Sequence, residues 1–351
     1  MQIYIHIPFC VSKCPYCAFG SFEDKSNLIQ TYFKALKDDI LHNFINSNLQ
    51  NKQISSIFIG GGTPSVANAK FYAPIFELLG PYLEKNAEIS SEANPNSANL
   101  AWLSQMRSFG LNRISFGAQS FDETKLKFLG RIHNSNQIYK AVQNANLAGF
   151  ENINLDLIYG TKFDNKKLLL NEIQNIAKLP VNHISAYSLS IEGNTKFANK
   201  PNYAKSSPNL AKFLFKQLAN LGFLQYEISN FAKNNQICKH NFGYWNKNDY
   251  LGFGAYSVGS MGNTRFNALN LQNYLKNPKF RKIENLSPSQ IKTEKIFLGL
   301  RSIVGVELKI FDESQLEKIK ILKKSNKIYI KNGKIFNKNF LIADEISLYL
   351  T

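Results

Sequence analysis

Three cysteines near the start of the chain form its most chemically specific pattern. Cys10, Cys14 and Cys17 are spaced C-x3-C-x2-C. Three thiolates can hold a 4Fe-4S cluster and leave one of its four irons without a protein ligand. An open iron can be chelated by a substrate or cofactor, and with this spacing the expected chelator is S-adenosylmethionine. The triplet therefore predicts an iron–sulfur site that can support radical chemistry.

Zinc and a disulfide are the competing interpretations of these cysteines. A structural zinc site needs four ligands, usually as two spaced pairs, but the only other cysteine is Cys238, far along the chain. A disulfide needs an oxidising compartment. The sequence opens with Met1-Gln2-Ile3-Tyr4 and shows no basic segment followed by a long apolar run, so we expect a cytoplasmic protein with reduced thiols.

Composition indicates a globular protein with an excess of positive charge. The 351 residues are 44% hydrophobic and carry a formal net charge of +17. Such a charge is compatible with nucleic-acid binding, but the lysines are scattered among asparagines and are denser only over residues 276–338. We therefore treat nucleic-acid binding as a minor alternative and expect no such partner. Acidic partners, including tetrapyrrole propionates or an anionic membrane surface, stay open.

Short β-branched and aromatic runs alternate with helical patterns along the first part of the chain. The predicted strands cover residues 3–7, 56–59, 88–91, 113–116, 152–157 and 183–189. This alternation predicts βαβ units and a parallel sheet, and six units favour an open, partial (β/α)6 barrel of the TIM type over a closed barrel of eight strands. The motifs quoted below lie at the carboxyl ends of these strands, where barrel enzymes build their active sites.

Composition changes near residue 225. Residues 225–265 are rich in aromatics, glycine and asparagine, and the chain from residue 287 has helical patterns followed by a predicted hairpin over residues 328–336 around Asn332-Gly333. We therefore expect two domains, an α/β barrel over residues 1–224 and a smaller α+β domain, winged-helix-like in its pattern, over residues 225–351.

The cysteine flanks and five later motifs resemble one branch of the radical S-adenosylmethionine (radical SAM) family. That branch contains the oxygen-independent coproporphyrinogen III oxidases and the HemW-type haem chaperones. The resemblance extends over most of the chain and rests on Tyr4-Ile5-His6-Ile7-Pro8-Phe9-Cys10, Gly60-Gly61-Gly62-Thr63-Pro64-Ser65, Ser91-Glu92-Ala93-Asn94-Pro95, Ser115-Phe116-Gly117-Ala118-Gln119-Ser120-Phe121, Leu129-Gly130-Arg131 and Asn154-Leu155-Asp156-Leu157-Ile158-Tyr159-Gly160.

The resemblance implies a set of residues that bind S-adenosylmethionine. Alone, the glycine triplet would indicate an ordinary strand-to-loop turn, and Asp156 a hydrogen-bonded residue at a strand end. In the family pattern these positions bind the cofactor, with backbone groups for its amino group, oxygens for its ribose and ammonium, and a guanidinium for its carboxylate. The implied set is Tyr4, Gly61, Gly62, Thr63, Glu92, Gln119, Arg131 and Asp156.

Two departures disfavour the oxidase side of the branch. Those oxidases carry an extra cysteine two positions after the third ligand, where this chain has Phe19, and they usually have an extension before the first strand. The chaperones carry a His-Asn-x-x-Tyr-Trp signature, which matches residues 240–245 here. The resemblance thus implies haem binding with His240 as a ligand. A packed, hydrogen-bonded histidine is the alternative, and Cys238 and Tyr256 are further candidate ligands.

The resulting expectation is a haem chaperone that holds a 4Fe-4S cluster, S-adenosylmethionine and haem. It would transfer haem to acceptor haemoproteins, some of them membrane-associated, and would draw on a reductant such as flavodoxin or ferredoxin if it performs radical chemistry. Whether it is an enzyme stays open. The alternative is an oxygen-independent coproporphyrinogen III oxidase that oxidatively decarboxylates propionate side chains.

Overall fold

Six parallel strands form the centre of the molecule in the computed structural model, which describes residues 1–47, 49 and 52–351. They lie side by side in chain order, as the sequence predicts, and form an open barrel rather than a closed one. Their bounds are β1 Gln2–Ile7, β2 Ile54–Gly61, β3 Leu83–Ala93, β4 Arg113–Gln119, β5 Asn152–Tyr159 and β6 His183–Ser188.

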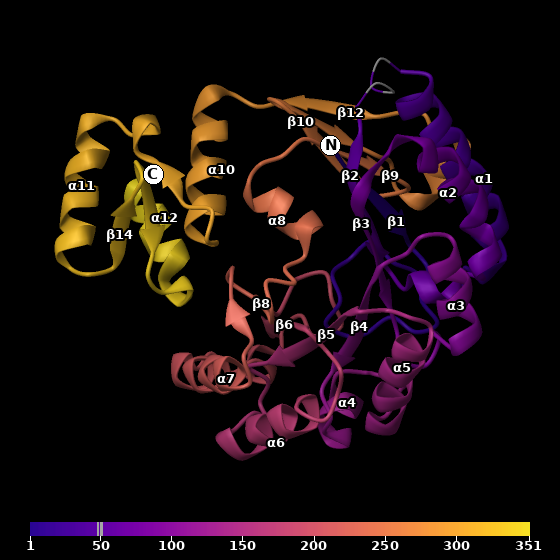
Figure 1. The fold of residues 1–351 in the computed structure, drawn as a ribbon, viewed down its shortest axis with the longest axis horizontal. Helices are drawn as coiled ribbons and strands as arrows, with labels where there is room; N and C mark the ends of the chain where they lie inside the picture. Colours follow the sequence, from indigo (N-terminus) through magenta and orange to yellow (C-terminus); the bar gives the residue numbers. More distant parts are fainter. Residues whose placement is uncertain (48, 50–51) are drawn as a thin grey trace.

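Helices between the strands cover the convex, outer face of the sheet (Figure 1). They are α1 Ile29–Ile40, α2 Ala73–Leu79, α3 Leu100–Ser108, α4 Glu123–Phe128, α5 Ser135–Leu147, α6 Lys166–Ile176 and α7 Pro208–Asn220. Asparagine, abundant in this chain, caps several of them. Asn99 accepts a hydrogen bond from Trp102 N–H at the start of α3, and Asn134 forms a capping box with Gln137 on α5.

Alternation along each strand separates an apolar outer face from a polar inner face. In β4, Ile114 and Phe116 are fully buried beneath the helices, whereas Arg113, Ser115 and Gly117 line an interior cavity. A polar barrel interior suits a ligand better than a close-packed apolar core, so this face locates the site.

Later segments complete both edges of the barrel sheet. On one side β9, Tyr250–Phe253, pairs in parallel with β1, and on the other β8, Asn230–Ala232, pairs antiparallel with β6. The remaining strands extend these edges, and α8 lies at the open side of the curved sheet (Figure 1). These elements are β7 Leu224–Gln225, α8 Lys239–Trp245, β10 Val258–Met261, β11 Thr264–Asn267, α9 Leu271–Lys276 and β12 Lys282–Asn285.

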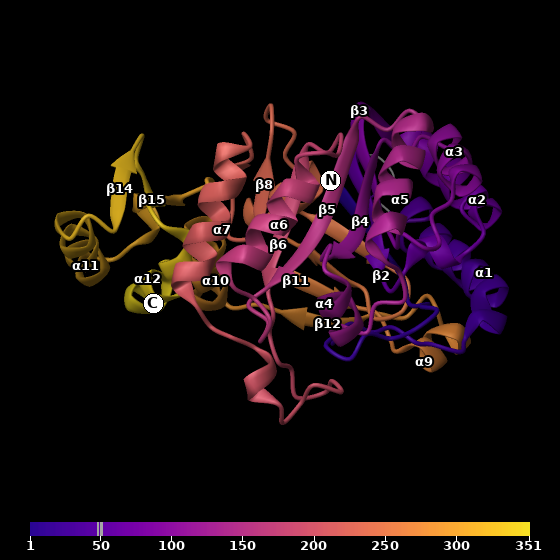
Figure 2. The ribbon, with the colours of Figure 1, turned by 90° about the horizontal axis from the view of Figure 1, so that it is seen from below.

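The C-terminal part forms a smaller α+β unit at one end of the molecule, where α10 contacts α8, and it lies far from α1 and α2 (Figure 2). Its three-stranded antiparallel sheet contains the predicted hairpin, in which Asn332 and Gly333 both have positive φ as a tight turn requires. Its elements are α10 Pro288–Leu300, β13 Val306–Glu307, α11 Glu313–Lys324, β14 Ile328–Lys331, β15 Lys334–Asn337 and α12 Ala343–Leu350.

Two main hydrophobic clusters lie in these two parts. The larger extends from Ile3 to Tyr274 and the second from Ile296 to Leu350. The expected boundary after residue 224 stays a prediction, while the barrel sheet itself continues to Asn285. Among the described helices, none is long and apolar enough to cross a lipid bilayer.

Candidate functional site

The three cysteines of the N-terminal motif line one cavity of about 740 Å³ inside the barrel. All three are free thiols and partly exposed. Thr63 donates a hydrogen bond to Cys10 Sγ at 3.5 Å, and Arg131 donates one to Cys14 Sγ at 3.2 Å. Burial raises the pKa of the Cys10 and Cys17 thiols, and a bound metal centre would favour their thiolate forms. The donor set therefore fits an iron–sulfur cluster.

The cysteine loop is tied to the loop that follows β2. Gly62 N–H donates to Ile7 O and Thr63 N–H donates to Phe9 O, both at 2.8 Å. A Cβ at Gly62 would lie 2.8 Å from each of these carbonyl oxygens, so only glycine allows this approach. Because these N–H groups are engaged, the backbone groups left for a ligand at this loop are carbonyl oxygens, which suit a ligand's amino group.

The motif containing Arg131 packs directly against the cysteine loop. Gly130 has φ of +68°, and a Cβ there would lie 2.4 Å from Pro15 Cδ, so glycine brings the next residue close to Cys14. Arg131 also donates to Asn94 Oδ1 at 2.6 Å and to Gly117 O at 2.9 Å. Its buried Nε has no partner among the described residues, and a guanidinium held this way can receive a carboxylate.

Two carboxyl groups, Glu92 and Asp156, line the same cavity as Arg131. Burial, with a smaller contribution from the nearby Asp156, raises the pKa of Glu92 to about 8. Burial also raises the pKa of Asp156, which accepts hydrogen bonds from Ser115 and Asn154. Two acids that resist ionisation beside each other favour a ligand that brings positive charge. A sulfonium and an ammonium group supply such charge.

The remaining residues of the implied set also reach this cavity. Tyr4 lines it and its hydroxyl contacts His6 Nδ1 at 3.0 Å. Gln119 ends β4 with φ of +66°, an uncommon conformation for a residue other than glycine, and lines the cavity as well. The structure therefore gathers all the implied residues around one space: Cys10, Cys14, Cys17, Tyr4, Gly61, Gly62, Thr63, Glu92, Gln119, Arg131 and Asp156.

Comparison with known proteins agrees with this geometry. Residues 4–176 match the family model of the radical SAM superfamily. The chain is 39% identical to the haem chaperone HemW of Haemophilus influenzae, covering 74% of this chain and 70% of that protein. It is 32% identical to HemW of Bacillus subtilis, covering 88% and 86% of the two chains. The chain belongs to the HemW family of radical SAM proteins. This membership implies a 4Fe-4S cluster and S-adenosylmethionine as cofactors.

The fold extends beyond the HemW family. Coproporphyrinogen III oxidase (HemN) from Escherichia coli, a radical SAM enzyme, superposes with a TM-score of 0.83 over 99% of this chain and 89% of that one, at 20% identity. At this identity the likeness concerns the fold, and it confirms the expected radical SAM barrel with an additional C-terminal α+β unit.

The HemW signature lies on α8, where His240 is fully buried. Its Nδ1 contacts Ser56 Oγ at 2.9 Å and its Nε2 contacts the Tyr244 hydroxyl at 2.8 Å. Burial lowers the pKa of His240 to about 3, so the imidazole is neutral. The structure does not place His240 on the cavity wall, and neither ring nitrogen is free for iron in this conformation. The signature residues that do line the barrel cavity are Asn241 and Tyr244.

The other two candidate haem ligands lie apart from each other. Cys238 lines the barrel cavity, and burial beside Glu88 raises the pKa of its thiol to about 12. Tyr256 has φ of +64° and its ring packs near His6 and Phe22, next to the cysteine loop. The structure therefore does not bring His240, Cys238 and Tyr256 together at one point.

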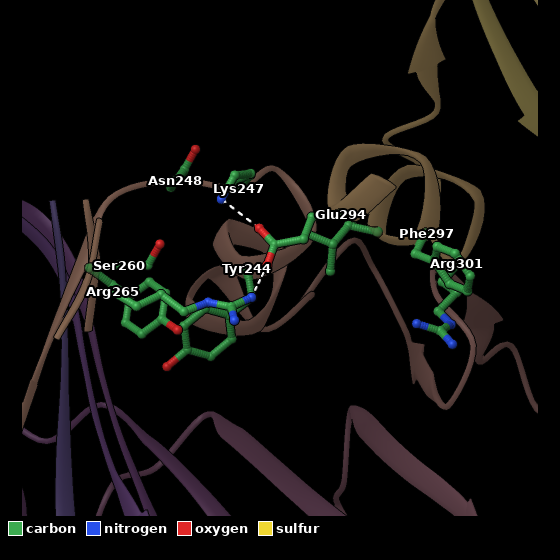
Figure 3. A pocket seen from close by; sticks show the side chains of 10 residues that line it. Tyr244, Lys247, Asn248, Ser260, Arg265, Glu294, Phe297 and Arg301 are labelled. Atoms are coloured by element: carbon green, nitrogen blue, oxygen red, sulfur yellow. Dashed lines mark hydrogen bonds and ion pairs between the residues drawn. The ribbon is translucent and has the colours of Figure 1, made fainter. Parts of the chain in front are cut away.

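A second, outer cavity of about 330 Å³ lies between α8, strands β9 to β11 and α10. Its floor carries an ion-pair network in which the Glu294 carboxylate contacts Lys247 at 2.8 Å and also contacts Arg265 (Figure 3). Tyr244 lines both cavities, so its side chain stands between them.

Sequence reasoning did not single out several residues that line the barrel cavity. The sequence motifs contain Asn94, Ser115 and Asn154 without indicating a role for them, and they do not include Arg113 or Tyr187. A period of two along the strands is the signal that could have found them, since Arg113, Ser115 and Gly117 share one face of β4.

Proposed function

We propose that this protein is a haem chaperone that binds haem, a 4Fe-4S cluster and S-adenosylmethionine and passes haem to acceptor haemoproteins. The observation that carries the proposal is identity of 32–39% to proteins described as haem chaperone HemW over most of the chain. The cavity supports it because the residues that the family pattern requires surround a single space beside the cysteines.

Each residue of the cavity has a proposed role. Cys10, Cys14 and Cys17 hold the cluster. Carbonyl groups of Gly61, Gly62 and Thr63 accept from the amino group of S-adenosylmethionine, and Arg131 binds its carboxylate beside Cys14. Tyr4, Glu92, Gln119 and Asp156 contact the rest of the ligand. When bound, the cluster and S-adenosylmethionine supply one-electron chemistry, and the surrounding side chains orient the ligand and limit water.

Haem binding is proposed near α8. The signature residues Asn241 and Tyr244 face the barrel cavity, and Tyr244 also borders the outer cavity. His240 becomes a haem ligand in this proposal only when its contact with the Tyr244 hydroxyl opens and frees Nε2. Cys238 and Tyr256 are alternative ligands. The proposed acceptors are haemoproteins, some of them membrane-associated. A flavodoxin or ferredoxin is the proposed reductant for any radical chemistry, and the proposed location is the cytoplasm.

Anaerobic haem titration beside a coproporphyrinogen III turnover assay tests the function. We expect saturable haem binding, seen in the Soret band, and no formation of protoporphyrinogen IX. Turnover that consumes S-adenosylmethionine, without saturable haem binding, would instead establish the oxidase.

Two variants test the role of His240. His240→Ala should alter the Soret spectrum and leave iron–sulfur absorbance unchanged. Tyr244→Phe removes the hydroxyl that occupies Nε2 and should preserve or strengthen a haem–imidazole spectrum if His240 is the ligand. Loss of haem binding in Tyr244→Phe with retention in His240→Ala would assign the interaction to Tyr244.

A further inference from the structure

Arg113 is a buried cation for which the described residues provide no acidic partner. It opens β4, its side chain lines the barrel cavity, and the residue is 3% exposed. One terminal nitrogen donates to Gln236 O at 3.3 Å, while the other is buried without a hydrogen-bond partner, and no ion pair within 4.0 Å involves Arg113 in the described part of the chain. Buried charges are rarely left unpaired in proteins because losing water disfavours the charged form.

The carboxylate that could have paired with Arg113 is already engaged. Glu88 lies on the neighbouring strand β3 and accepts hydrogen bonds from Lys239 N–H at 3.0 Å, from His240 N–H at 3.1 Å and from the Cys238 thiol at 3.5 Å. Its negative charge thus holds the first turn of α8. The other groups near the guanidinium are neutral, since burial lowers the pKa of His183 and raises that of Cys238.

The position of Arg113 separates it from the proposed S-adenosylmethionine carboxylate site. Arg131 contacts Gly117 O, and Gly117 lies four residues after Arg113 on the same face of β4. At a rise of roughly 3.3 Å per residue the two arginine sites are about 13 Å apart along the strand. Both line one continuous cavity, with the cysteines at one end and Arg113 with Cys238 at the other.

We propose that Arg113 forms a carboxylate-binding subsite at the floor of the barrel cavity, which Asn241 also lines as a neutral hydrogen-bonding group. A guanidinium with free N–H groups binds carboxylates through paired hydrogen bonds, and a ligand carboxylate would satisfy the terminal nitrogen that has no partner among the described residues. The carboxylate has two sources with the same chemistry, a propionate side chain of a tetrapyrrole or a small free carboxylic acid. Only the tetrapyrrole source rests on the proposed haem function.

Thermal unfolding of the full chain, with its cluster reconstituted anaerobically, tests the subsite. The melting temperature is measured against sodium propionate and against neutral propionamide, at constant ionic strength. We expect a saturable rise with propionate and none with propionamide. In Arg113→Met the propionate effect should fall at least tenfold in apparent affinity, whereas Arg107→Met, which changes an exposed arginine on α3, should behave like the wild type.

The source is identified with protoporphyrin IX and its dimethyl ester as probes. The subsite binds a tetrapyrrole propionate if three results hold: protoporphyrin IX stabilises the wild type, its dimethyl ester does not, and Arg113→Met weakens the stabilisation. Stabilisation by propionate with no such difference between the porphyrins assigns it to a small acid. The subsite is refuted if the wild type responds equally to propionate and propionamide and also responds equally to the free porphyrin and its ester. This comparison uses only the wild type, so it does not depend on whether a variant folds. A negative result would refute the subsite without refuting haem binding by other groups.

Discussion

The barrel cavity and the outer cavity both border the Tyr244 side chain, but they differ in how their charged groups are balanced. In the outer cavity, Glu294 lies between Lys247 and Arg265, and Glu284 also pairs with Arg265 at 3.8 Å. Two cations and two carboxylates therefore balance one another without a ligand. In the barrel cavity, Glu92 keeps its proton up to about pH 8 and Arg113 has no acidic partner. A cavity whose charges are matched can be structural, whereas one whose charges are unmatched is built around molecules that complete it.

The largest expected effect is loss of the cluster, which we predict for substitutions at only one end of the barrel cavity. Ser substitution of Cys10, Cys14 or Cys17 should abolish the 4Fe-4S cluster, because three thiolates are the minimum that the site offers. Cys238→Ser should keep it, since this thiol is hydrogen-bonded to Glu88 at the other end of the cavity. Anaerobic reconstitution followed by visible absorbance and iron counting provides the measurement. A cluster retained in Cys14→Ser, or lost in Cys238→Ser, contradicts the assignment.

A second, intermediate effect concerns affinity for S-adenosylmethionine. Arg131→Ala and Asp156→Ala should each weaken binding roughly tenfold or more, because a charge-assisted contact is worth about 1.5–3 kcal/mol. Equilibrium binding to variants with verified cluster content gives the value. Arg301→Ala, in the outer cavity, is the matched control and should bind normally. Equal affinity in all three variants would place the ligand outside the barrel cavity.

The smallest expected effect contrasts Glu92 with Glu294 through pH. The folded state holds the Glu92 proton up to about pH 8, while the unfolded chain releases it above about pH 4.5. The unfolded state is therefore favoured increasingly as pH rises across this interval. Glu92→Gln should remove this part of the pH dependence, as measured by denaturant unfolding of the cofactor-free protein at pH 5 and pH 8.

Glu294→Gln supplies the comparison. Its ion pairs lie near the surface, so their loss should cost less than about 1 kcal/mol. If Glu92→Gln and the wild type lose equal stability between pH 5 and pH 8, the Glu92 carboxyl is ionised throughout, and the contrast between the cavities fails for this residue.

Local patterns predicted the barrel well because they depend on neighbours in sequence. The six strands follow from short β-branched runs, and the terminal hairpin follows from Asn332-Gly333, whose conformations are intrinsic to those residues. The cysteine spacing and the motifs at strand ends also predicted residues that meet around one cavity, since parallel strands bring their carboxyl ends to one edge.

Features that depend on contacts distant in sequence escaped prediction. His240 is hidden because Ser56 and Tyr244 occupy both of its ring nitrogens, and nothing near residue 240 specifies the contact with β2. Arg113 stands unpaired because Glu88 is engaged by α8, which is far away in the chain. The sequence signature pointed to His240, whereas Asn241 and Tyr244 are the signature residues that line the barrel cavity.

The pairing of β1 with β9 has a consequence for biosynthesis. Strand β1, Gln2–Ile7, acquires its outer neighbour only after Tyr250–Phe253, far later in the chain, has been made. During that interval the edge of β1 exposes unpaired backbone groups next to the loop that carries the cysteines, and such edges recruit foreign strands. Translation speed and chaperone protection over this interval thus bear directly on how much of the newly made chain matures.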